Sequence, residues 1–112
     1  MTKKQVMVFR ILLIGIVLLL PLKTQEKKIE YPKCEYQGIR LYGKVKFVSS
    51  FPDIKIQFVN SFADIHVKFV DHFPDDCGKW QIVESFPDFT VQVVESFPDI
   101  KVKVVESFPG KP

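Results

Sequence analysis

The chain has 112 residues, of which 46% are hydrophobic and 13% aromatic, with 11 Phe. This composition favours one small folded domain and excludes a disordered chain or a multidomain enzyme. The formal net charge is +3, but residues 1–43 carry eight Lys or Arg against three acidic residues, whereas residues 44–112 carry eight against ten. The repeat-containing part is therefore slightly acidic, and we expect it not to bind nucleic acid.

The N-terminal segment has the composition of an export signal. Three basic residues precede an apolar run over 11–22, and a polar stretch follows it. We predict that residues 1–25 form a hydrophobic helix that acts as a signal peptide or, because no small-residue cleavage site follows Leu22, as an uncleaved signal-anchor. The protein is then periplasmic or extracellular, and this segment is its only membrane contact. Residues 26–43 are interpreted as a spacer that leads into the domain.

Two cysteines are the only thiols, Cys34 in the lead-in and Cys77 in the middle of the domain. An even number of cysteines in an exported chain indicates a disulfide, so we predict that these two are bridged. The alternative is two unpaired cysteines, one of them buried.

An 11-residue repeat occupies residues 44–110. Its most regular feature is a phenylalanine at equal spacing, with one longer step of 13 residues in the middle, at Phe51, Phe62, Phe73, Phe86, Phe97 and Phe108. Between these positions apolar and polar residues alternate with β-branched enrichment, which predicts half-buried strands. We therefore predict an all-β domain of six short strands, three on each side of a central insertion. A proline in most units argues against a right-handed coiled coil of the same period.

Each repeat turns at a Ser-Phe-Pro-Asp corner. Proline favours an extended conformation for the residue before it, and Asp is a common turn cap, so we predict extended, buried Phe corners capped by Asp. The doubled apolar pair that ends most strands, as in Phe58-Val59, predicts that both faces of the sheet are covered there. Two ordinary architectures fit this pattern, a six-stranded meander and a tight β-solenoid.

The units of strand plus Asp-containing corner, interrupted once at Gly78-Lys79-Trp80, resemble the 7(1) septoil knot domain family over about Gly43–Pro109. The resemblance implies a small all-β domain whose chain forms a deep 7(1) torus knot. It implies no catalytic residue. The Phe-Pro corners depart from the polar residues that we expect of this family at those positions.

No group of residues matches a known reaction centre. The recurring aspartates, Asp53, Asp64, Asp75, Asp88 and Asp99, lack the glycine-rich loops of calcium-binding repeats, and turn capping accounts for each of them. His66 and His72 have no nucleophile and acid in a recognisable frame, and four zinc ligands at suitable spacing are absent from the sequence around Cys77. We therefore predict no catalytic residue, no metal and no cofactor.

We expect a non-enzymatic structural or interaction domain of unknown biochemical role. The alternative is a binding module for envelope polysaccharide or for a protein partner in the envelope. A binding module should expose an aromatic or charged patch that differs from unit to unit, whereas a purely structural domain should expose only the repeating Lys, Gln and Asp residues.

Overall fold

The computed structural model describes residues 28–112, so the predicted signal or anchor helix lies outside the described residues. The described chain contains strands, turns and bends but no helix, and thus no helix long and apolar enough to cross a membrane. The all-β prediction is confirmed. The eight strands are β1 (Glu35–Tyr36), β2 (Ile39–Arg40), β3 (Gly43–Phe47), β4 (Ile54–Phe58), β5 (Ile65–Phe69), β6 (Lys79–Ile82), β7 (Phe89–Val93) and β8 (Ile100–Val104).

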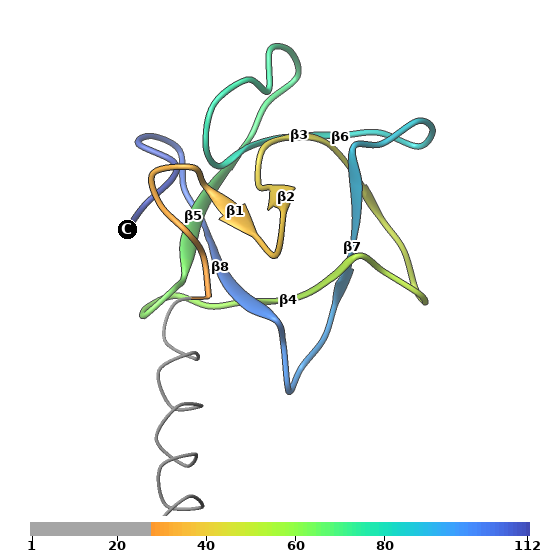
Figure 1. Ribbon diagram of the computed structural model, residues 1–112, viewed down its shortest axis with the longest axis horizontal. Helices are drawn as coiled ribbons and strands as arrows, with labels where there is room; N and C mark the ends of the chain where they lie inside the picture. Colours follow the sequence, from red (N-terminus) through yellow and green to blue (C-terminus); the bar gives the residue numbers. More distant parts are fainter. Residues whose placement is uncertain (1–27) are drawn as a thin grey trace, which may run out of the picture.

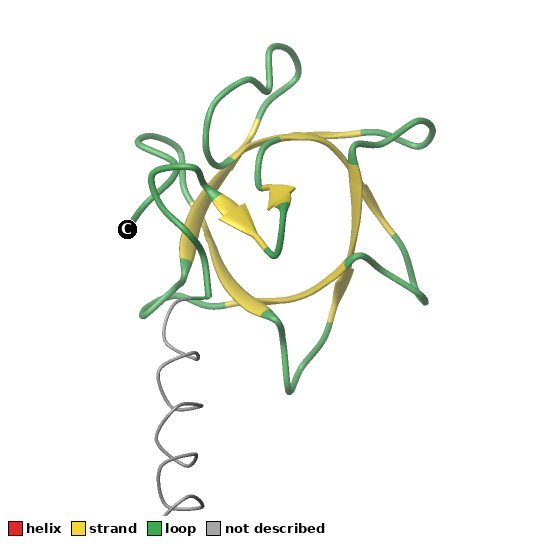
Figure 2. Ribbon diagram, viewed as in Figure 1, coloured by secondary structure: helices red, strands yellow, loops and turns green. Residues whose placement is uncertain are grey.

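Strands β3 to β8 form a closed barrel, seen as a ring of yellow strands in Figure 2, and their order in it is β3-β6-β5-β8-β4-β7. These are the six strands of the repeat, and every pair of neighbours is parallel. The meander is therefore wrong, because its consecutive strands would be antiparallel. The solenoid is also wrong, because the sheet closes on itself and leaves no open edge.

From β3 to β8 the chain winds round this barrel about one and a half times, and Gly110, which is bridged to His66 of β5, brings it almost to a second full turn. Each 11-residue step moves it two strand positions and skips the strand between, as from β3 past β7 to β4. The 13-residue step from β5 to β6 moves it only one position, so β6, β7 and β8 enter the gaps left by β3, β4 and β5. The longer central step is thus the feature that interleaves the two windings, an arrangement consistent with a knotted β domain.

Each connection between the barrel strands β3 to β8 lies on the outside of the barrel, where Figure 1 shows the loops projecting from a ring of strands. The loop from β3 to β4 is bonded at both ends to the strand that it passes: Val48 N–H donates to the Val91 carbonyl at 2.8 Å, and Asp53 N–H to the Thr90 carbonyl at 3.1 Å. The interior is filled with side chains, so the loop has to pass outside β7.

The strands contribute side chains to the barrel interior in layers. If one goes from each residue to its partner on the next strand, one circuit of the barrel returns to the first strand about 12 residues further along. The strands are therefore steeply tilted to the barrel axis, and each contributes one residue to a layer. The middle layer is fully buried and consists of Val45, Ile56, Val67, Trp80, Val91 and Val102. The layer at the N-terminal end of the strands is also buried and contains Ile54, Ile65, Phe89 and Ile100, with Gly43 and Gly78 at its two other positions.

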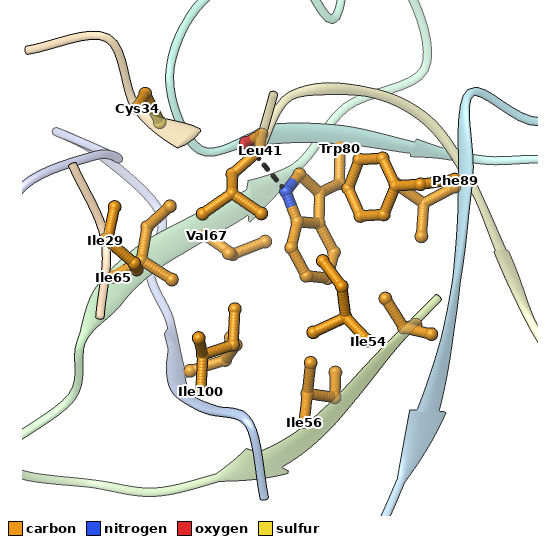
Figure 3. Close-up of a cluster of buried hydrophobic side chains, with 13 residues drawn as sticks. Ile29, Cys34, Leu41, Ile54, Ile56, Ile65, Val67, Trp80, Phe89 and Ile100 are labelled. Carbon is orange, nitrogen blue, oxygen red and sulfur yellow. Dashed lines mark hydrogen bonds between the residues drawn. The ribbon is translucent and has the colours of Figure 1, made fainter. Parts of the chain in front are cut away.

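The lead-in closes the N-terminal end of the barrel. Figure 1 shows the β1–β2 hairpin within the outline of the ring, and Leu41 after it is fully buried beside Trp80 (Figure 3). The Trp80 indole N–H donates to the Leu41 carbonyl at 3.0 Å, and Gly78 N–H donates to the same carbonyl at 3.1 Å. Residues 28–43 are therefore part of the folded core and not only a spacer.

The predicted disulfide is present between Cys34 and Cys77, with a Cα–Cα distance of 5.8 Å. It joins the lead-in to the central insertion at the closed end of the barrel. Gly78 lies beside it with a φ of +83°, and a Cβ there would collide with the His66 carbonyl oxygen. The insertion therefore needs glycine at this position, because the neighbouring backbone approaches too closely for any side chain.

Candidate interaction surface

The six corner phenylalanines are on the outside of the protein. Their exposed fractions range from 78% at Phe73 to 97% at Phe51. The prediction that these rings are buried is wrong, because the barrel interior is already filled by two residues of each strand and the corners lie on the outer loops. Polar neighbours such as Glu84-Ser85 before Phe86 were the sequence signal for an exposed position.

The backbone of these corners is also different from the prediction. All six phenylalanines have a left-handed conformation, with φ between +53° and +57°. Phe62 precedes Ala63 instead of a proline and has the same φ of +57°, so the turn rather than the proline ring selects this conformation. A left-handed backbone is unfavourable for a bulky side chain and suits Gly or Asn. At each of the six corners, therefore, an aromatic residue has a strained backbone and an exposed side chain.

The aspartates of the repeat hold neighbouring strands together, a longer-range role than the predicted turn cap. Asp99 Oδ2 accepts from the Lys55 N–H at 2.7 Å, while Asp99 N–H donates to the Lys55 carbonyl at 2.8 Å. Four aspartates make this two-way contact with a residue of the strand that their loop passes: Asp53, Asp64, Asp88 and Asp99. Gly110 occupies the next repeat position, and its N–H and carbonyl form hydrogen bonds with the carbonyl and N–H of His66.

A shallow depression lies near the disulfide. It has a volume of about 420 Å³ and is lined by Tyr31, Cys77, Lys79, Lys111 and neighbouring residues. The Tyr31 hydroxyl donates to the Asp64 carbonyl at 2.8 Å, and burial, together with the Asp64 carboxylate, raises the pKa of Tyr31 to about 12. This hydroxyl is therefore neutral and structural at physiological pH.

The residues considered for chemistry do not assemble into a site within residues 28–112. No three or more His, Cys, Asp or Glu side chains in this range lie close enough to hold a metal ion. His66 is on the outer, polar side of β5, and His72 is exposed in the following loop. The surface is therefore neither a patch that differs from unit to unit nor only the repeating Lys, Gln and Asp residues, because every unit also exposes a corner phenylalanine. This ring of phenylalanines is the feature that distinguishes the surface of the described residues.

Comparison with known proteins identifies the domain. The sequence matches the profile of the 7(1) septoil knot domain over residues 38–112. The chain belongs to the 7(1) septoil knot domain family. The septoil knot match includes all six barrel strands and begins at Gly38, so Ile29 and Cys34 of the buried lead-in precede it. No curated protein matches the chain.

Proposed function

We propose that this septoil knot domain is an exported, non-enzymatic interaction module that binds its partners through the corner phenylalanines. The observation that carries the proposal is the combination of 78–97% exposure with a left-handed backbone at all six corners. Strained residues persist where the surrounding structure imposes them and are concentrated at functional sites. Here the rings gain little burial within residues 28–112, so contact with another molecule is the use that we infer for them.

Export is part of the same proposal. The apolar run over 11–22 behind a basic start is typical of an export signal, and the Cys34–Cys77 disulfide is compatible with an oxidising compartment. An uncleaved N-terminal segment would hold the domain close to the membrane, where envelope proteins are within its reach.

The test compares the full wild-type chain with a variant in which all six corner phenylalanines are replaced by Asn. Asn tolerates the left-handed backbone, so the variant should keep its Trp80 fluorescence and its protease resistance. Chemical cross-linking in intact cells should give complexes with the wild type and lose them with the variant. Equal cross-linking of the two proteins would contradict the proposal.

Envelope polysaccharide is the second candidate partner, favoured by the almost complete exposure of flat aromatic rings at repeated positions. Aromatic faces suit the C–H surfaces of sugar rings, whereas an apolar protein pocket accepts Leu as well as Phe. Co-sedimentation with insoluble cell-wall material therefore separates the two candidates. A six-fold Phe→Leu variant should lose binding to a polysaccharide but retain cross-links to a protein partner.

We further propose that the chain is a deep 7(1) torus knot. Two interleaved windings with external crossovers support this topology, as does membership of the septoil knot family. A knotted chain can lose its packing while it stays knotted, whereas a newly made chain has to thread before it folds, so threading should add a slow step to first folding only. After reduction of the disulfide, briefly denatured protein should refold, followed by Trp80 fluorescence, much faster than newly synthesised chain folds for the first time. Equal rates for the two would contradict a deep knot.

A further inference from the structure

The two ends of the barrel differ. The N-terminal end is closed by Leu41, whereas the layer at the C-terminal end remains open to solvent. That layer alternates aromatic and aliphatic residues round the barrel, in the order Phe47, Ile82, Phe69, Val104, Phe58 and Val93. Apart from Phe47, which is half-buried, its members are 38–47% exposed. The predicted covering of both faces at the strand ends is therefore wrong at this end of the barrel.

The alternation produces three notches. Each has a small aliphatic residue, Ile82, Val93 or Val104, between the aromatic residues of the two neighbouring strands. The rings of Phe47 and Phe69, on either side of β6, have centroids 6.5 Å apart and are in contact, so no side chain fits between them. Ile82 is nevertheless 47% exposed, so it is accessible past the edges of these rings. The Val104 notch coincides with a depression of about 200 Å³ that also includes Phe58.

Each notch has an acidic residue at its outer edge. A glutamate follows each aliphatic residue after one intervening position, and all three are exposed: Glu84, Glu95 and Glu106. At the same distance after the three aromatic residues of the layer, the chain has Ser49, Asn60 and Asp71 instead of glutamates. An apolar floor with a carboxylate at its lip matches the side chain of Lys or Arg, which combines an apolar stem with a charged head.

Charge selects among the possible occupants of this surface. Two copies meeting end to end would bring their acidic rims together, and an anionic lipid surface would be repelled by the same rim. Lys46, Lys68 and Lys103 occupy outward-facing strand positions next to the layer, and Lys103 also lines the Val104 notch. The Ile82 and Val93 notches have Gln81 and Gln92 in this position on their own strands, and the nearest lysines, Lys46 and Lys68, are on the neighbouring strands β3 and β5. A cation should therefore bind more strongly at these two notches than beside Lys103.

We propose that the C-terminal end of the barrel binds a basic protein segment. The stems of two Lys or Arg side chains lie over the exposed Ile82 and Val93, against the edges of the neighbouring aromatic rings, and their charged heads pair with Glu84 and Glu95. A third basic side chain binds more weakly at Val104. This surface is separate from the corner phenylalanines, so the inference goes beyond the proposed function and does not depend on it.

The test uses a fluorescein-labelled 12-residue peptide of alternating Lys and Leu, with a Glu–Leu peptide as its matched control. Fluorescence anisotropy measures binding to the full chain held in phosphatidylcholine nanodiscs, with empty nanodiscs as the blank. We expect the Lys–Leu peptide alone to bind. The exposed double substitution Glu84→Gln/Glu95→Gln should weaken it by about tenfold, which corresponds to about 1.4 kcal/mol. Phe97→Asn, at a corner, should leave it unchanged.

Several results would overturn this inference. Equal binding of the Glu–Leu peptide, or no effect of the Glu84 and Glu95 substitutions, would remove the role of the acidic rim. An equal loss with Phe97→Asn would move the binding surface to the corners. If the chain binds phosphatidylglycerol vesicles and the Gln substitutions strengthen this binding, the occupant is lipid. If sedimentation shows a dimer and Phe58→Ser dissociates it, the occupant is a second copy of the chain.

Discussion

Replacing Phe97 by Asn should not destabilise the domain, although Phe97 belongs to the most regular feature of the sequence. The ring is 90% exposed, so the tenth of its surface that is covered contributes only about 0.2–0.3 kcal/mol. Its φ of +54° costs a bulky residue about 1 kcal/mol, a cost that Asn largely avoids. The free energy of unfolding should therefore stay the same or rise by up to about 1 kcal/mol.

Ile100 is the matched control, because it belongs to the same repeat unit and is fully buried. Ile100→Ala should lower the free energy of unfolding by about 2–5 kcal/mol through lost burial and a residual cavity. Both variants are measured by guanidinium titration with Trp80 fluorescence, after incubation long enough for unfolding and refolding curves to coincide. A loss above about 1 kcal/mol for Phe97→Asn would mean that the ring packs within the domain, which would contradict its exposure.

Three further perturbations test the contacts around the barrel. Folding raises the Tyr31 pKa from 10.0 to about 12, so stability should be retained below pH 10 and fall as the pH rises towards 12; Tyr31→Phe should flatten this dependence in urea titrations. Replacing both Cys34 and Cys77 by Ser opens a 43-residue loop and should cost about 4 kcal/mol while the circular dichroism of the barrel is retained. Asp99→Ala should cost about 1 kcal/mol in thermal unfolding, because Lys55 N–H loses its carboxylate partner, and Asp99→Asn should cost less.

The strands can be predicted from the pattern of the sequence, but which strands lie next to each other in the barrel cannot. Alternation such as Ile54-Lys55-Ile56 marks each strand, and the 11-residue spacing marks the unit, because both reflect local backbone geometry. Strand order depends on contacts between distant residues, such as the pairing of Val45 with Phe89, and no local pattern encodes these contacts. The 13-residue step was visible in the sequence, but its effect on the interleaving of strands appears only in the barrel.

The corner phenylalanines show why hydrophobicity alone misplaces a side chain. Phe97 and Phe89 are the same residue type in adjacent units, yet one is 90% exposed and the other 3%. Phe89 occupies an inward strand position, whereas Phe97 is in a loop that must pass outside β4. Proline favours an extended conformation for the residue before it, but the geometry of the loop overrides that preference at Phe97.

If the corner phenylalanines form an interaction surface, they should be exposed in the isolated domain and covered in its natural setting. Hydroxyl-radical footprinting with mass spectrometry measures both states, in the purified full chain and in intact envelopes. We expect strong oxidation of the six corner rings in the purified chain, with buried Phe89 protected. In envelopes the corner rings should become protected while exposed Lys111 remains as reactive as before. Corner rings that are oxidised equally in both states would contradict an interaction surface at these positions.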